Sequence, residues 1–274
     1  MRGSVIRSVF VIILLSFPRA AFAHHPVVET GFGRRGPIRT IAAQTLEKGK
    51  WAASFQMEHF DFDSFSDEEL VSFSLEVKDA HSADSITQAF MVGSYGITDD
   101  LTVSLKLPYV WFDNIREAHA DEPGEVHVHG DSDGIGDLSL FGQYRFFSRS
   151  GYEAALLFGS EFPTGRTNKK DIDNVRFDAE FQPGSGSFDP FFGMAGQKSI
   201  GSFGLYASLL YMVVTEGDQD TDLGDTFSYN AALSYSPCQG PLAWDLILEL
   251  NGEYKQRQET AGIKDPNSGG NVIL

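Results

Sequence analysis

Apolar and polar side chains alternate along most of this chain, and this period of two limits its fold more than any other feature. Between residues 101 and 111 the sequence LTVSLKLPYVW places apolar side chains at every odd position. Successive side chains of a strand point to opposite faces of its sheet, so the pattern predicts a strand with one apolar and one polar face. The pattern recurs at 136–147, 152–162, 226–236 and 242–255, and less regularly at 49–60, 84–97, 187–198 and 203–214. The sequence therefore predicts an all-β fold with nine long strands.

Strands of this kind fit two classes of protein. A soluble sandwich turns the apolar face toward a core, whereas an outer-membrane barrel turns it toward lipid and its polar face toward the lumen. The predicted strands run to about 10–14 residues, longer than the five or six that are usual in soluble sheets. Aromatic residues gather at the strand ends, as in the interfacial girdles of membrane barrels. These features favour a transmembrane antiparallel up-and-down β-barrel. The aromatic residues are Trp51, Tyr95, Tyr109, Trp111, Tyr144, Phe146, Tyr152, Phe162, Tyr211, Tyr235, Trp244 and Tyr254.

The first 23 residues have the layout of a secretory signal peptide. Arg2 and Arg7 precede an apolar run at 9–17, and Ala21-Phe22-Ala23 fits the small-residue cleavage pattern. The run is too short to span a bilayer. We therefore expect three parts: a cleaved signal peptide at 1–23, a periplasmic or lumen-plugging segment at 24–48, and a barrel at 49–274.

The lengths of the predicted connections supply an orientation and a strand count. Short connections at 98–100, 147–151, 199–202 and 236–241 alternate with long polar ones at 61–83, 112–135, 163–186, 215–225 and 257–270. Outer-membrane barrels have short periplasmic turns and long extracellular loops. Residues 175–182 also alternate, which leaves a hairpin arm in the third long loop open. Residues 271–274 only begin a tenth strand, whereas a closed bacterial barrel needs an even number. We expect a C-terminally truncated barrel of about 12 strands, with a complete ten-stranded barrel as the alternative.

Composition and motifs exclude several functions. A formal net charge of −17, from 38 acidic and 21 basic residues, argues against a nucleic-acid partner. The single cysteine excludes an internal disulfide and any CxxC motif. The chain has no P-loop, HExxH or GxSxG motif, and His81-Ser82 falls in the first long loop, away from the predicted strands. We expect no enzymatic activity, with a hydrolase in the barrel wall as the less favoured alternative.

The polar face of the predicted strands would line the lumen. By parity it carries six acidic and three basic side chains, which would bias an aqueous pore toward cations. Pairing of these groups across neighbouring strands, which would plug the barrel, is an equal alternative. Arg34, Arg35 and Arg39 precede the first strand, and this basic arm either enters the lumen or stays solvated. The lumen-lining set is Lys106, Asp137, Arg145, Glu153, Glu161, Asp245, Glu249, Glu253 and Lys255.

Histidines in the second long loop suggest a second kind of site. His127 and His129 lie two residues apart, so they present two imidazoles on one side of an extended segment. With His119, Asp131 and Asp133 they offer nitrogen and oxygen ligands that suit Zn, Cu or Ni. A solvated polar loop without metal is the simpler interpretation, and no other cofactor is expected.

Several motifs in a consistent order resemble one family. They are YGITDDLTVSLKLPYV (95–110), GIGDLSLFGQYRF (134–146), PTGR (163–166), QPGSGSFDPFFG (182–193), TEGDQDTDLGDTFSYNAALSY (215–235) and ELNGE (249–253). Over residues 40–274 the chain resembles the outer-membrane "transporter" family catalogued as the putative meta-pathway of phenol degradation. The resemblance implies a barrel of about twelve strands that passes small or hydrophobic molecules, or in one branch a secretion pore.

We therefore expect a passive channel for small solutes in the bacterial outer membrane. Its expected partners are outer-membrane lipid, the barrel assembly machinery and an unidentified solute, with homo-oligomerisation left open. The alternative is a surface barrel that binds divalent metal through its histidine-rich loop.

Overall fold

A computed structural model describes residues 7–10, 37–62, 65–77, 79–237, 244–265 and 268–273. Of the predicted signal peptide, only Arg7–Phe10 is among them; the other residues of that prediction lie outside the described part. No helix of the described residues is long and apolar enough to cross a membrane.

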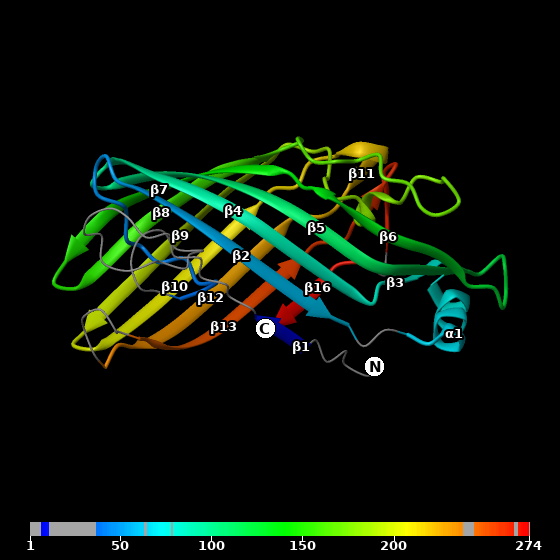
Figure 1. The fold of residues 1–274 in the computed structure, drawn as a ribbon, viewed down its shortest axis with the longest axis horizontal. Coiled ribbons are helices and arrows are strands. Elements are labelled where there is room, and N and C mark those ends of the chain that lie inside the picture. Colours follow the sequence, from blue (N-terminus) through cyan, green and yellow to red (C-terminus); the bar gives the residue numbers. More distant parts are fainter. Residues whose placement is uncertain are drawn as a thin grey trace, which may run out of the picture.

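Nine long antiparallel strands form one curved sheet in chain order (Figure 1). They are β2 (Trp51–Asp61), β4 (Ser85–Thr98), β5 (Leu101–His119), β7 (Leu138–Arg149), β8 (Tyr152–Phe162), β9 (Asp189–Ile200), β10 (Phe203–Met212), β12 (Thr226–Tyr235) and β13 (Leu246–Lys255). The short strand β16 (Gly270–Ile273) follows β13, and β1 (Arg7–Phe10) pairs with β2. The prediction of an up-and-down β fold with nine strands and the beginning of a tenth is confirmed. In the described residues, the two ends of this strand order are not paired with each other, so the sheet is not closed.

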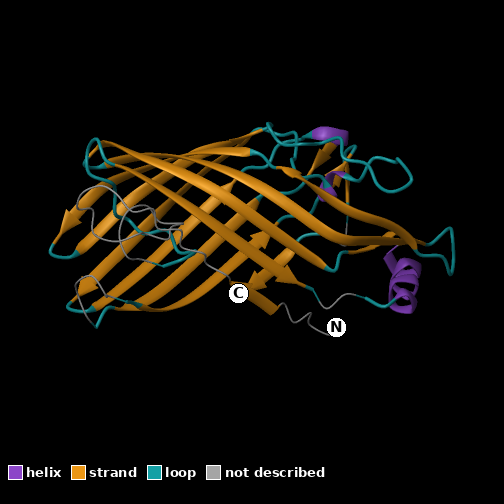
Figure 2. Ribbon diagram, in the orientation of Figure 1, coloured by secondary structure: helices purple, strands orange, loops and turns teal. Residues whose placement is uncertain are grey.

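Short and long connections alternate as predicted in the described part of the chain, which leaves out most of the predicted short connection at 236–241. Two-residue turns at 99–100, 150–151 and 201–202 join strands at one end of the sheet, which we call the short-turn end. The opposite, long-loop end carries the remaining elements (Figure 2). These are α1 (Asp67–Val77), β3 (Asp79–Ser82), β6 (His127–Ile135), the 3-10 turns η1 (Ala179–Phe181) and η2 (Asp218–Asp220), β11 (Thr221–Asp222), β14 (Glu259–Thr260) and β15 (Ile263–Lys264). Within 175–182, Arg176 makes an isolated antiparallel bridge with Lys170, but no strand follows and η1 ends the stretch.

The second long loop is shorter than predicted. β5 continues past Trp111 to His119 and returns as β6, so most of the predicted loop at 112–135 is a hairpin. The pairing register shifts between Phe112 and Ile115 and again between Ile115 and Arg116. Such bulges interrupt the alternation of side chains, which is why the sequence pattern ends too early.

The side chains on the polar face of the sheet are buried, and those on its apolar face are exposed. In β5, Thr102 and Ser104 are buried, whereas Leu105 and Leu107 are 45% and 40% exposed. On neighbouring strands Leu156, Met194 and Leu209 lie side by side and are all exposed. A soluble sheet would bury such a row. This distribution is the one expected of a barrel whose outer surface meets lipid.

An arginine in place of Met194 tests whether this outer face meets lipid. Because Met194 lies in the middle of β9, the charge would sit near the bilayer midplane and lower the free energy of unfolding by about 2–4 kcal/mol. Urea titration of protein folded in lipid vesicles measures the change. Ile200→Arg, on the same face beside the turn, is the control and should cost at most about 1 kcal/mol. Negligible costs at both positions would contradict a lipid-facing surface.

Candidate functional site

Residues 37–48 lie inside the curve of the sheet, against its polar face (Figure 1). Thr40 and Ala43 are completely buried, and Ala43 packs with the inward-facing Ala155, Leu157 and Ala195. We call residues 37–48 the lumen segment. It begins beside β13, contacts β10, β9 and β7 in turn, and reaches β5 before the chain enters β2. Of residues 24–48, for which the sequence left the lumen or the periplasm open, 24–36 with Arg34 and Arg35 lie outside the described residues, and 37–48 lie against the polar face of the sheet.

One carboxylate holds the start of the lumen segment. Glu249 of β13 accepts hydrogen bonds from the backbone N–H groups of Ile38, Arg39 and Thr40 and from the Thr40 hydroxyl. The Arg39 and Thr40 nitrogens each lie 3.0 Å from Glu249 Oε2. Consecutive N–H groups form a concave anion site, and hydrogen bonds to a charged acceptor are stronger than neutral ones. Glu249 is therefore the strongest anchor of the segment.

Arg39 links the lumen segment to β2, the strand at the other end of the strand order. Its Nη2 lies 2.8 Å from Glu58 Oε2 on β2, and its guanidinium stacks over Phe60, 5.2 Å from the ring centroid. Residues 38–40 thus join β13 to β2, which are the last and first of the nine long strands.

Neutral side chains of the lumen bind the middle of the segment through its backbone. The N–H of Ile41 donates to Ser208 Oγ at 3.1 Å, and the N–H of Ala43 donates to Gln197 Oε1 at 3.0 Å. From the other side, Gln143 Nε2 donates to the carbonyl groups of Ala42 and Gln44, both at 2.8 Å. Inward-facing side chains here supply the hydrogen bonds that a neighbouring strand would otherwise make.

A glycine allows the segment to leave the lumen at the short-turn end. The N–H of Gly49 donates to the Gly96 carbonyl at 2.8 Å, and the N–H of Gly96 donates to the Lys50 carbonyl at 2.9 Å. A Cβ atom at Gly96 would overlap the carbonyl oxygens of Leu46 and Glu47. The close approach of the two backbones therefore requires glycine at position 96.

Several of the predicted lumen-lining residues pair with one another or with neighbours. Arg145 binds Glu153 across neighbouring strands, with Nη1 and Oε1 3.1 Å apart, and Glu161 accepts the Ser139 hydroxyl at 2.9 Å. The Lys106 ammonium lies over the ring of Phe90, 4.7 Å from its centroid. The other four predicted residues lie at the margins of the ladder: Asp137 just before β7, Asp245 just before β13, and Glu253 and Lys255 exposed at its end.

The structure brings only part of the set predicted to bind metal together: the rings of His119 and His127 lie 5.5 Å apart, measured between their centroids. His127 Nε2 lies 2.5 Å from Glu122, Asp131 accepts the N–H of Asn114, and Asp133 accepts hydrogen bonds from Tyr109 and Lys169. Of the predicted set, only His119 and His129 approach a common partner, which is Glu117. The bulges of the hairpin break the regular two-residue spacing that the prediction assumed, and Asp131 and Asp133 bind other partners.

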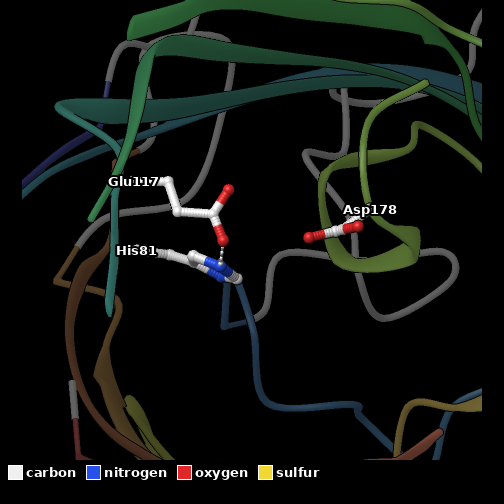
Figure 3. Close-up of side chains that lie close together, drawn as sticks. All are labelled: His81, Glu117 and Asp178. Atoms are coloured by element: carbon white, nitrogen blue, oxygen red, sulfur yellow. Dashed lines mark hydrogen bonds and ion pairs between the residues drawn. The ribbon is translucent and has the colours of Figure 1, made fainter. Parts of the chain in front are cut away.

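A different group of side chains converges at the long-loop end. His81 and Glu117 face each other across β3 and β5, and the Asp178 carboxylate approaches them from the loop between β8 and β9 (Figure 3). We call His81, Glu117, His129 and Asp178 the histidine cluster. The expectation that His81 lies away from the strands is wrong, because β3 pairs with the extended part of β5. β3 has only four residues, too few to reveal a strand by alternation.

Comparisons with known proteins agree with this architecture. The sequence profile of the family described as "Putative MetA-pathway of phenol degradation" matches residues 82–274. The fold is similar to the crystal structure of an outer membrane channel from Pseudomonas putida F1, with a TM-score of 0.52. The two chains are 14% identical, and the match covers 84% of this chain and 82% of that one. No curated protein matches the chain.

Replacing Glu249 with alanine tests the anchor of the lumen segment. Loss of hydrogen bonds to a charged acceptor, each worth about 1.5–3 kcal/mol, should increase amide exchange at Arg39 and Thr40 about 10- to 100-fold. Hydrogen–deuterium exchange of the folded protein measures the rates. Glu253→Ala removes the same charge from an exposed site on the same strand and should leave them unchanged. Equal exchange in both variants would show that Glu249 does not hold the segment.

Proposed function

The chain belongs to the family described as "Putative MetA-pathway of phenol degradation", and from this premise we propose that it is an outer-membrane channel. It passes small solutes passively through the lumen, and the lumen segment limits the passage. The observation that carries the proposal is the placement of residues 37–48 against the polar inner face of a sheet whose outer face is apolar. The fold shared with an outer membrane channel supports it.

The lumen segment obstructs the passage, and the hydrogen bonds that hold it are of a kind that allows it to move. Apart from the Arg39 ion pair and the Thr40 hydroxyl, the side chains of β13, β10, β9 and β7 bind backbone groups of the segment. Water satisfies the groups that Ser208, Gln197 and Gln143 bind nearly as well when the segment leaves, because the net value of a neutral hydrogen bond is only about 0.5–1.5 kcal/mol. A solute therefore passes when the segment shifts away from part of the inner face.

The charges of the lumen give the channel a mild preference for cations. Arg145 and Glu153 form an ion pair, and Glu249 is covered by hydrogen bonds from three backbone N–H groups only as long as the segment is in place. Displacement of the segment leaves this carboxylate facing the passage. Rings of acidic side chains attract cations into a pore.

The proposal also covers the export, the membrane insertion and the orientation of the channel. The chain is exported by a cleaved signal peptide, inserted by the barrel assembly machinery and surrounded by outer-membrane lipid, with its long-loop end outside the cell. It has no enzymatic activity, and the solute is a small molecule that fits beside a displaced segment.

Conductance in planar lipid bilayers tests the proposal. The wild-type chain should give small and intermittent currents, and Glu249→Ala should raise the open fraction because the segment loses its charged anchor. The reversal potential in a potassium chloride gradient reports the preference for cations. Glu253→Ala serves as the matched control.

Folding is verified separately, by the gel shift between boiled and unboiled samples. Folded protein that conducts no ions in any variant would contradict the channel. Currents that are identical in wild type and Glu249→Ala would contradict the role of the lumen segment.

A further inference from the structure

We propose that the histidine cluster, formed by His81, Glu117, His129 and Asp178, is a binding site for a divalent cation of the zinc class. Ligand atoms of His81, Glu117 and Asp178 all lie within 4.8 Å of one another. His81 Nε2 is 2.6 Å from Glu117 Oε1, and His129 Nε2 is 3.1 Å from Glu117 Oε2. Two imidazole nitrogens thus face the two oxygens of one carboxylate.

The second nitrogen of each imidazole is held in the way typical of metal-binding histidines. His81 Nδ1 lies 2.5 Å from Glu180 Oε1, and His129 Nδ1 lies 2.8 Å from Asp171 Oδ2. A carboxylate on Nδ1 fixes the ring orientation and makes Nε2 a better ligand. Both rings are therefore oriented before a cation arrives, with Nε2 directed toward Glu117.

The donor set selects the class of cation. The imidazole nitrogen of His81 and the carboxylates of Glu117 and Asp178 form a three-ligand nitrogen and oxygen set of the kind that zinc binds, with a fourth position left for water. Calcium and magnesium prefer oxygen ligands alone and more of them. The cluster therefore favours zinc over these two ions.

A cation can reach the cluster from solvent. A cavity of about 300 Å³ is lined by His81, Asp178 and Glu180 together with residues of η2 and β14. Asp178 is itself exposed, and the whole chain carries a net charge of −17. Acidic clefts concentrate cations at their mouths.

Protons compete with the cation for the same atoms. Burial alone would lower the pKa of His81, but its hydrogen bonds with Glu117 and Glu180 raise it to about 10. Burial alone would raise the pKa of Glu117, but the hydrogen bond with His81 lowers it. A cation binds an imidazole nitrogen only after that nitrogen has lost its proton, so the affinity falls as the pH falls.

The site connects three parts of the long-loop end. His81 comes from β3, Glu117 from β5 and Asp178 from the loop between β8 and β9, while His129 of β6 contacts Glu117. A bound cation would cross-link this loop to the β5–β6 hairpin. The inference rests on these side chains and is independent of the proposed channel.

Titration of the full chain with Zn²⁺ tests the site. The protein is folded in detergent micelles, checked by its gel shift and protease resistance, and titrated in a calorimeter. His24→Ala and His25→Ala are included in every variant, since these two histidines offer competing ligands. We expect one Zn²⁺ per chain, no measurable binding in His81→Ala or Glu117→Gln, and an affinity about 10- to 100-fold lower in Glu180→Gln.

Two control variants keep the result specific. His59→Ala changes a histidine that pairs with Thr87 on the barrel wall, and His127→Ala changes the separate group formed with Glu122 and Glu125. Both should bind Zn²⁺ with unchanged affinity. The proposal is overturned if folded wild type binds no Zn²⁺, if His81→Ala and Glu117→Gln bind it normally, or if His127→Ala alone abolishes binding.

Discussion

The hydrogen bonds between neighbouring strands are the interactions on which the rest of the structure depends. In lipid no water can replace them, so each backbone group of a membrane-spanning strand needs a partner within the sheet. The ladder from β2 to β13 supplies these partners and leaves the side chains free to divide between two faces. Small polar side chains such as Thr102, Ser104 and Ser208 then turn inward. Their hydroxyl groups give the interior a surface that can hold a further piece of backbone.

The lumen segment uses this surface to connect the two ends of the strand order. Glu249 on β13 and Glu58 on β2 bind adjacent residues of the segment, so residues 38–40 form a polar bridge between strands that do not pair with each other in the described part of the chain. The remaining contacts spread over β10, β9 and β7. The same segment that fills the lumen therefore also holds the curvature of the sheet.

Much of the fold could be predicted because alternation is a local property of each strand. The nine strands, the alternation of short and long connections and the inward parity of Glu249 all follow from neighbouring residues. The candidate sites depend on contacts between distant residues, such as Glu249 with Thr40 or His81 with Glu180, and no periodicity reports these. The lumen segment binds mostly through its backbone, so its side chains do not reveal its location. The bulges near Ile115 likewise removed the alternation that would have placed Glu117 on a strand.

The bulges of β5 have a mechanical consequence. One strand carries Thr102, which binds the lumen segment, and Glu117, roughly 50 Å away at a rise of about 3.3 Å per residue. A regular β5–β6 ladder would connect the tip of the hairpin directly to the barrel wall. The two register shifts and the left-handed backbone of Asn114, with φ of 51°, interrupt this ladder between the two points. The hairpin is therefore not joined to the wall by one regular β5–β6 ladder, and β5 bends at the point where it leaves the strands around the lumen.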